Sequence, residues 1–223
     1  MTIGIVGGKG KLGSVIYNAI KTTSEMIEAV IIENANELLD TIDKVDVYID
    51  CTSVNAFMQN INAYMIIGRP LVLATTGFSG DELKKILELS KGIPVIKAAN
   101  FSIGVYKYLK IVEYVTRLLG AEYEIGIIEK HHRDKKDFPS GTANEMIKVI
   151  HKVTPEKGID VNSIRMFDVV GEHELYFRGP DGEMIELSHR IFNREGFANG
   201  AITAAKWILN MDNGLYSMSD MLE

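Results

Sequence analysis

The sequence predicts an α/β protein whose N-terminal part forms a parallel sheet and whose second part is an α+β domain on a mostly antiparallel or mixed sheet. Two observations lead to this prediction. Short apolar runs alternate with segments of helical period as far as residue 100, which is typical of parallel strands joined by crossover helices. Beyond residue 100 the strand-like runs are longer and hairpin turns separate them. We therefore expect two domains that meet over a short hinge near Asn100.

In the first domain, strands are predicted where apolar residues are consecutive and helices where apolar residues recur every three or four positions. Leu12, Ile16 and Ile20, for example, fall on one helical face behind the first strand. The predicted strands cover residues 3–6, 29–32, 45–50, 71–74 and 94–97, and the further helices cover residues 36–41, 54–67 and 81–91.

In the second domain, Gly179 and Gly182 bracket a turn between two strand-like runs, which predicts a hairpin. A long helix precedes these strands and a shorter helix follows them. The predicted strands cover residues 123–128, 174–178 and 183–191, and the predicted helices cover residues 103–119 and 199–210.

Composition limits the class of protein. Of the 223 residues, 46% are hydrophobic and 24% are charged, as is usual for a soluble globular protein. The pI near 5.5 argues against a nucleic-acid-binding surface. No apolar run approaches the ~18 residues of a membrane span, and the chain begins with a strand pattern rather than a signal peptide. We expect a cytoplasmic protein with neither a nucleic-acid nor a membrane partner.

A glycine-rich turn, Gly7-Gly-Lys-Gly-Lys-Leu-Gly13, follows the first predicted strand and opens the first helix. A dinucleotide-binding fingerprint requires this context, so the parallel sheet is predicted to be of the Rossmann type. Glycines at this spacing allow a tight turn, close approach to a pyrophosphate and close packing of helix on strand. The alternative is a tight strand-to-helix connection without a ligand. The residues expected to contact the cofactor here are Gly7, Gly8, Lys9, Gly10, Lys11 and Leu12.

An acidic residue, Glu33, follows the second predicted strand, where the fingerprint places a ribose contact. A carboxylate there favours NADH over NADPH, although Lys9 and Lys11 could still receive a 2′-phosphate, so both cofactors stay open. Two later strand ends belong to the same edge of a parallel sheet and are expected to line the nicotinamide side. They supply Ala74, Thr75, Thr76, Ala98, Ala99, Asn100 and Phe101.

The stretch from Glu129 to Ala143 concentrates four Lys or Arg side chains and two adjacent histidines in a chain of net charge −6, which suits a small anionic substrate. It follows a predicted strand, so we expect His131 and His132 to leave the edge of a sheet. An imidazole can donate a proton at neutral pH, whereas an ammonium mainly binds anions. We therefore predict His131 as the general acid, assisted by Lys135.

A helix is predicted to start within this stretch. Thr142 and Glu145 fit a capping box, and Gly141 keeps a side chain away from the free N–H groups, which would bind a carboxylate. One alternative is a solvated run of charges before a capped helix. Another is a zinc site formed by His132, Asp134 and Asp137, but the neighbouring cations oppose a divalent ion, so we predict no metal.

With both motifs in place, the chain closely resembles the 4-hydroxy-tetrahydrodipicolinate reductases, also called dihydrodipicolinate reductases, of the diaminopimelate route to lysine. The likeness covers essentially the whole chain, and residues 131–143 are similar to the family signature of a His pair, a lysine and Asp, any residue, Pro-Ser-Gly-Thr. The resemblance implies NAD(P)H-dependent reduction of a dicarboxylate with loss of water. It implies His131 and Lys135 as the catalytic pair and a substrate site formed by His132, Ser140, Gly141 and Thr142.

The resemblance also implies a domain organisation. The C-terminal helix returns to the first domain, giving a dinucleotide-binding domain of residues 1–100 and 194–223 and a substrate-binding and oligomerisation domain of residues 101–193, in a homotetramer. Departures from the family pattern are Lys9 in the turn, Ala74 in place of Gly, and Asn34 where an arginine often receives a 2′-phosphate. The alternatives are a dinucleotide sensor without catalysis and a related two-domain amino-acid oxidoreductase.

Overall fold

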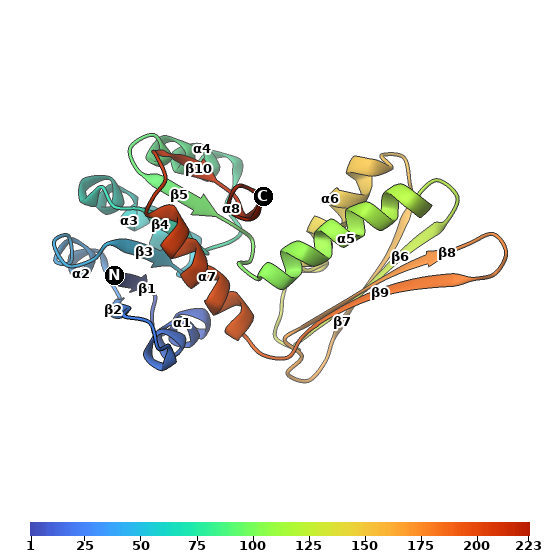
Figure 1. Cartoon of the computed structure of the whole chain (residues 1–223), viewed down its shortest axis with the longest axis horizontal. Helices are drawn as coiled ribbons and strands as arrows, with labels where there is room; N and C mark the ends of the chain where they lie inside the picture. Colours follow the sequence, from blue (N-terminus) through green and yellow to red (C-terminus); the bar gives the residue numbers. More distant parts are fainter. The chain divides into compact units, whose positions relative to one another are not determined.

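The computed structural model describes residues 1–223, which divide into two compact units (Figure 1). The first unit consists of Met1–Ser102 together with Glu195–Glu223, and the second consists of Ile103–Arg194. Each unit contains one β-sheet. None of the helices combines the length and the apolar composition that crossing a membrane requires.

The sheet of the first unit has six strands in the order β10-β5-β4-β3-β1-β2, and every neighbouring pair is parallel. The chain reverses its direction of progress across the sheet between β1 and β3, which is the switch point where open parallel sheets bind ligands. The predicted parallel sheet is confirmed. The strands are β1 (Thr2–Val6), β2 (Glu28–Ile32), β3 (Val47–Asp50), β4 (Leu71–Leu73), β5 (Pro94–Lys97) and β10 (Gly214–Tyr216).

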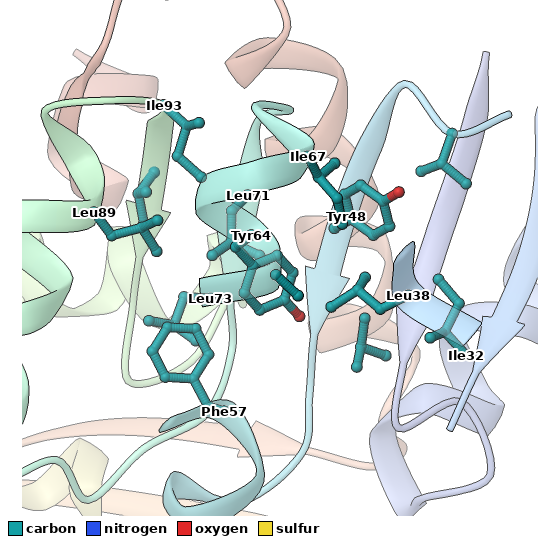
Figure 2. Packing of buried hydrophobic residues seen from close by; sticks show 14 of the residues in the cluster. Ile32, Leu38, Tyr48, Phe57, Tyr64, Ile67, Leu71, Leu73, Leu89 and Ile93 are labelled. Atoms are coloured by element: carbon teal, nitrogen blue, oxygen red, sulfur yellow. The ribbon is translucent and has the colours of Figure 1, made fainter. Parts of the chain in front are cut away.

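Helices pack on this sheet and bury its apolar residues. One cluster joins β3 and β4 to α3 through Tyr48, Leu71, Phe57 and Tyr64, all almost fully buried (Figure 2). Helices α1 and α7 pack against each other. The helices of this unit are α1 (Lys11–Thr22), α2 (Ala35–Leu39), α3 (Val54–Ile67), α4 (Gly80–Ser90), α7 (Glu195–Ile208) and α8 (Met218–Leu222).

Two elements of the first unit differ from the sequence prediction. Strand β10 was not predicted, because it is only three residues long and lacks an apolar run. Helix α7 begins at Glu195, earlier than the predicted residue 199, and includes two glycines that disfavour a helix. Gly200 is required there, because a Cβ atom on it would lie 1.7 Å from the carbonyl oxygen of Phe101.

The sheet of the second unit is mixed, with the order β7-β6-β8-β9. Strand β6 pairs in parallel with β7 and antiparallel with β8, which pairs antiparallel with β9. The predicted mixed sheet is confirmed, although β7 was missed because Asp160, Asn162 and Ser163 interrupt its apolar pattern. The elements are α5 (Ile103–Leu119), β6 (Glu124–His131), α6 (Gly141–Val153), β7 (Ile159–Arg165), β8 (Gly171–Arg178) and β9 (Met184–Ile191).

Helices α5 and α6 pack together and cover one face of this sheet with an apolar core. Along β6, the side chains on the covered face are Ile125 and Ile127, followed by Glu129 and His131, and all four are buried. The covered face therefore changes from apolar to polar toward the carboxyl end of β6. This polar end contains the candidate site.

Candidate active site

His131 is the last residue of β6, an inner strand of its sheet, and only 8% of it is exposed. The expectation that both histidines leave a sheet edge is therefore wrong for His131, because the strand continues three residues beyond the predicted end at residue 128. His132 follows β6, is half-buried, and its carbonyl accepts a hydrogen bond from the N–H of Lys135 at 3.1 Å. Strand geometry thus fixes His131, whereas His132 and Lys135 belong to the loop.

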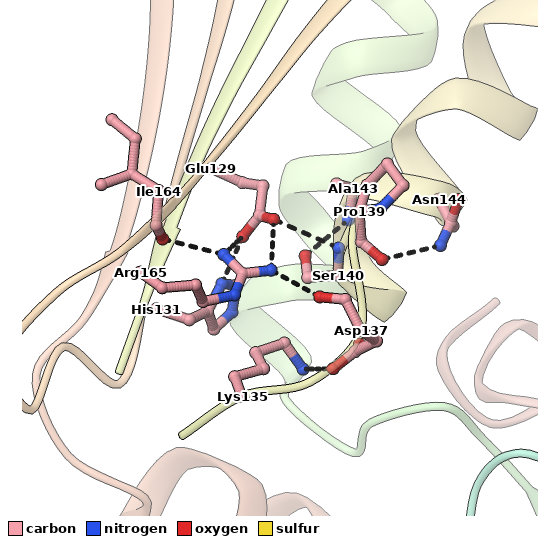
Figure 3. A network of polar contacts seen from close by, with 10 residues as sticks. All are labelled: Glu129, His131, Lys135, Asp137, Pro139, Ser140, Ala143, Asn144, Ile164 and Arg165. Atoms are coloured by element: carbon pink, nitrogen blue, oxygen red, sulfur yellow. Dashed lines mark hydrogen bonds and ion pairs between the residues drawn. The ribbon is translucent and has the colours of Figure 1, made fainter. Parts of the chain in front are cut away.

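A buried carboxylate holds the His131 ring. The Nδ1 atom of His131 forms a hydrogen bond with Oε2 of Glu129, two residues earlier on the same face of β6 (Figure 3). A carboxylate ion only accepts hydrogen bonds, so Nδ1 carries the hydrogen. The Nε2 atom has no hydrogen-bond partner within the protein. The geometry fixes one tautomer of His131 and leaves Nε2 as its reactive nitrogen.

Arg165 compensates the charge of Glu129. Its guanidinium group donates to both carboxylate oxygens of Glu129, at 2.7 Å and 3.0 Å, from the end of the neighbouring strand β7. Burial by itself raises the pKa of Glu129, but hydrogen bonds from His131 and Arg165 outweigh it and hold the pKa well below its ordinary range. Glu129 is therefore ionised at neutral pH although none of it is exposed.

Arg165 also fixes the loop that follows β6. Its Nη2 atom donates to the carbonyl of Asp137 at 2.6 Å, and the guanidinium carbon lies 4.3 Å from the ring centre of Phe138. The carboxylate of Asp137 in turn pairs with the ammonium of Lys135 at 2.8 Å (Figure 3). One arginine thus connects the carboxylate behind His131 to the loop segment that contains Lys135.

Helix α6 begins at Gly141, and its N-cap is Ser140. The predicted capping box of Thr142 and Glu145 is therefore wrong, because the Ser140 hydroxyl accepts from the N–H of Ala143 at 3.2 Å and the helix starts earlier. The Ser140 N–H donates to Glu129 at 3.3 Å, so Ser140 serves the network and the helix. The N–H groups of Gly141 and Thr142 have no partner within the protein, and the space beside Gly141 is open.

The structure places no group of three or more His, Cys, Asp or Glu side chains that could hold a metal ion. Of the residues considered as zinc ligands, Asp137 pairs with Lys135.

In the first unit, the glycine-rich turn has the strained and crowded geometry that the fingerprint predicts. Gly7 has a φ of +81°, which favours glycine, and its carbonyl accepts from the N–H of Gly10 at 2.9 Å. A Cβ atom on Gly13 would lie 2.4 Å from the Gly7 carbonyl oxygen. The N-cap of α1 is Gly10, so no side chain occupies the N–H groups of Lys11 and Leu12.

Glu33 follows β2 and points back to this turn. Its carboxylate accepts from the backbone N–H of Lys9 at 3.2 Å and lies 4.0 Å from the Lys9 ammonium. A second carboxylate, on Glu37, accepts from the N–H of Glu33 at 2.8 Å and from the side chain of Asn34 at 2.6 Å. The segment after β2 therefore carries two acidic side chains, and Lys9 pairs with one of them, Glu33.

The remaining predicted cofactor residues follow β4 and β5 at the same carboxyl edge as the glycine-rich turn and Glu33. The hydroxyl of Thr75 is buried and donates to Asp50 at 3.0 Å, while Ala74, Thr76, Ala98 and Ala99 are at least partly accessible. The amide oxygen of Asn100 accepts from the N–H of Ser102, and the Phe101 side chain is in the core. Phe101 can therefore offer a ligand only its backbone.

Sequence reasoning gave no role to Glu129 or Arg165, which complete the network around His131. The period of two along a strand is a signal for Glu129, because residues 129 and 131 share a face once the strand is extended. No local signal identifies Arg165, because it comes from β7, which the sequence did not reveal.

Comparisons with known proteins support a family. Residues 1–101 match the family model described as dihydrodipicolinate reductase, N-terminus, and residues 104–222 match its C-terminus. The chain is 39% identical to the 4-hydroxy-tetrahydrodipicolinate reductase of Archaeoglobus fulgidus over 259 aligned positions, covering all of both chains. It is also 39% identical over 196 positions to that of Syntrophus aciditrophicus, covering 79% of this chain and 73% of the relative.

The fold is similar to a solved structure, dipicolinate-bound dihydrodipicolinate reductase from Paenisporosarcina sp. TG-14. The TM-score is 0.79 at 22% sequence identity, with 100% of this chain and 99% of the other covered.

Proposed function

The chain belongs to the dihydrodipicolinate reductase family, and we propose that it reduces 4-hydroxy-tetrahydrodipicolinate to tetrahydrodipicolinate, with loss of water, in diaminopimelate and lysine biosynthesis. The observation that carries the proposal is the buried Glu129 that fixes His131 beside the open start of α6. Such an arrangement combines a proton donor with a binding site for a carboxylate.

We propose that His131 donates the proton that the reaction consumes. Each turnover adds a hydride and a proton to the substrate and releases one water molecule. With Nδ1 bound to ionised Glu129, a protonated His131 donates from Nε2 and keeps its Nδ1 hydrogen, as in other carboxylate-histidine pairs.

The substrate carboxylates are proposed to bind the N–H groups of Gly141 and Thr142, with His132 and Lys135 nearby on the loop. The dipole of α6 and the unpaired N–H groups favour an anion at this position. Lys135 pairs with Asp137 in this structure, so a substrate carboxylate would compete with Asp137 for the ammonium. A solved reductase of this fold contains dipicolinate, which agrees with a dicarboxylate ligand.

The residues of the first unit fit a nicotinamide dinucleotide. The glycine-rich turn has no room for side chains, since a Cβ atom would lie 2.8 Å from Thr52 at Gly7 and 2.4 Å from the Gly7 carbonyl oxygen at Gly13. The start of α1 offers N–H groups for a pyrophosphate. When bound, the dinucleotide supplies the hydride. The proposed contacts are Gly7, Gly8, Lys9, Gly10, Lys11, Leu12, Glu33, Ala74, Thr75, Thr76, Ala98, Ala99, Asn100 and Phe101.

We propose that NADH is preferred over NADPH. The carboxylate of Glu33 would accept from the ribose hydroxyls, and Glu37 beside it adds a second negative charge that opposes a 2′-phosphate. Asn34 caps α2 through its side chain and supplies no cation. Lys9 lies next to Glu33 and is partly neutralised by it.

We also propose a cytoplasmic homotetramer. The uncovered face of the second unit's sheet exposes Ile164 in line with the charged row of Lys130, Glu172 and Arg190, and exposes Met184 at the opposite end of the sheet. The family resemblance points to this sheet as the oligomer surface. Light scattering of the purified protein measures the mass of the assembly. A monomer across the working concentration range would contradict the tetramer.

The function is tested with NADH or NADPH and freshly generated 4-hydroxy-tetrahydrodipicolinate, following the loss of reduced-nicotinamide absorbance. We expect turnover with both cofactors and a higher kcat/KM with NADH. Lys135→Ala and His131→Ala should lower kcat far more than they weaken dinucleotide binding. A protein that binds NADH but never oxidises it in the presence of this substrate would instead be a dinucleotide sensor.

A further inference from the structure

The buried side-chain nitrogens without a hydrogen-bond partner lie together in the second unit. They are Nδ1 and Nε2 of His173, Nδ1 of His189 and Nε of Arg165. The strand register places these residues on the same covered face as Glu129 and His131: His173 lies opposite Glu129, and His189 lies opposite His173. Sequence analysis gave His173 and His189 no role. Their position beside the proton donor distinguishes them from the other histidines.

Three imidazole rings form a row across the sheet from β6 to the edge strand β9. The ring centres of His131 and His173 are 5.2 Å apart, and those of His173 and His189 are 5.9 Å apart. His173 is 1% exposed, whereas His189 is half-buried and has only one buried ring nitrogen. The row therefore runs from a partly accessible ring, through a fully buried ring, to His131.

Neighbouring residues shape this row. Tyr108 stacks on His189 with ring centres 5.2 Å apart, and its hydroxyl donates to the Leu187 carbonyl at 3.1 Å. At the other end, a Cβ atom on Gly171 would lie 3.2 Å from Nε2 of His131 and 3.5 Å from Cε1 of His173. Glycine thus leaves the space beside the reactive nitrogen of His131 free of side chain.

His173 is a neutral ring. Burial, followed by the neighbouring His131 and His189, lowers the pKa of His173 to about 3. A neutral imidazole needs one donor and one acceptor as partners, and leaving such buried atoms unpaired costs about 1–3 kcal/mol each. Two water molecules, one at each nitrogen, satisfy these requirements, and buried water commonly occupies such positions. The charged and titratable groups around His173 are Glu129, His131, Arg165, His189, Lys135 and Tyr108.

We propose that His173 and His189, bridged by ordered water, form a proton relay that recharges His131 from solvent after each turnover. The incoming proton binds one nitrogen of His173 while the proton on the other nitrogen leaves toward Nε2 of His131, so the ring passes a proton without retaining charge. Solvent supplies the one proton that each reduction consumes. The relay rests on the proposed function, and His173 acts through His131 rather than on the substrate.

The test replaces His173 with phenylalanine, which has a similar shape and no nitrogens. We expect kcat to fall about tenfold or more, within the range for lost proton-transfer assistance, and the solvent isotope effect on kcat to rise. The KM values for substrate and dinucleotide should stay unchanged. The midpoint of thermal unfolding should not fall, because phenylalanine fills a similar space and needs no hydrogen-bond partner. His189→Gln should show a smaller loss of kcat.

Two further variants sharpen the test. Gly171→Ala keeps a permitted backbone conformation but places a methyl group beside Nε2 of His131, so it should also raise the solvent isotope effect. His151→Gln is the matched control, because His151 is an exposed histidine on α6 whose ring contacts the Lys157 carbonyl, and it should leave kcat unchanged. If the wild type is active and His173→Phe has the same kcat and the same solvent isotope effect, the proposed relay is wrong.

Ring-nitrogen NMR of labelled histidine separates the relay from the function, because it needs no substrate. We expect a neutral His173 at pH 6, and a changed ring-nitrogen signal of His131 in His173→Phe. If the wild type fails to reduce the substrate, the proposed function is wrong, but the NMR measurement still reports whether His173 and His131 interact. A charged His173 at pH 6, or identical ring-nitrogen signals of His131 in both proteins, would contradict the relay.

Discussion

The two proposed binding sites offer opposite means of holding a charged ligand. The glycine-rich turn of the first unit offers backbone N–H groups, and its requirement is the absence of side chains, as Gly13 shows with 2.4 Å between its would-be Cβ and the Gly7 carbonyl. The polar end of the second sheet relies on buried side chains, with Glu129 contacting His131, Arg165 and the start of α6. A site made of backbone N–H groups thus depends on the spacing of glycines along a short stretch of sequence. A site made of side chains depends on the pairing of strands that are distant in the sequence.

The comparison implies different sensitivities to mutation. A side-chain network that buries a charge loses both stability and chemistry when one member is removed. A backbone site tolerates changes in the surrounding side chains but not the addition of a Cβ atom within it. The following experiments test this difference.

The largest effect is expected for Glu129→Gln. The amide has the same shape but no charge, so Arg165 is left buried without its counter-ion and His131 loses the carboxylate that fixes its tautomer. We expect kcat to fall about a hundredfold or more and the free energy of unfolding to fall by about 3–5 kcal/mol. Steady-state kinetics and urea unfolding measure the two effects.

The control for that variant is Glu88→Gln, which removes an exposed carboxylate paired with Lys91 and should change stability by less than about 1 kcal/mol. Equal losses in the two variants would show that the Glu129 network has no special role.

Gly13→Ala should abolish dinucleotide binding while leaving the second unit folded. The added methyl group would contact the Gly7 carbonyl and force the turn open, with a stability cost of about 1–3 kcal/mol. Gly80→Ala is the matched control at the first residue of α4, where a Cβ atom meets nothing within 4 Å. Titration calorimetry with NADH compares the two variants; tight binding by Gly13→Ala would refute the backbone site.

The ratio of kcat/KM for NADPH to that for NADH should rise about tenfold in Glu33→Gln, because charges about 4 Å apart that are well exposed to water interact with about 1 kcal/mol or slightly more. Glu37→Gln should shift the ratio in the same direction but less, since part of the negative charge of Glu37 is already offset by the hydrogen bond that its carboxylate accepts from the Asn34 side chain. The measurement is steady-state kinetics with both cofactors. A ratio that falls in either variant would show that these carboxylates do not select against the 2′-phosphate.

The smallest effect concerns stability in acid. The pKa of His173 is lowered by burial to about 3 in the folded protein, whereas an unfolded histidine titrates near ~6.5. Between these two pKa values the unfolded state binds a proton at this histidine and the folded state does not. The stability that comes from His173 being neutral is therefore fully present above pH ~6.5 and is lost as the pH falls toward 3. His173→Phe should lose less stability than the wild type between pH 6.5 and 4 in urea unfolding. If the free energy of unfolding falls equally with pH in both proteins, His173 is not a neutral ring in the folded protein.

The fold was largely predictable because its signals are local. Helix α3 covers the predicted residues 54–67, and α5 covers the predicted residues 103–119, since apolar residues recur at helical spacing in both. The motif of residues 131–143 identified the region of the site. Its geometry was not predictable, because the partners of Glu129 come from β7 and from the start of α6, and β7 has no strong apolar pattern.

The most direct test of the central claim, that His131 fixed by Glu129 donates the proton for reduction, is the single-turnover rate of NADH oxidation in His131→Gln against the wild type. Glutamine cannot donate a proton at neutral pH, so we predict a rate about a hundredfold or more lower, with an unchanged dissociation constant for NADH. Equal single-turnover rates in the two proteins would contradict the account.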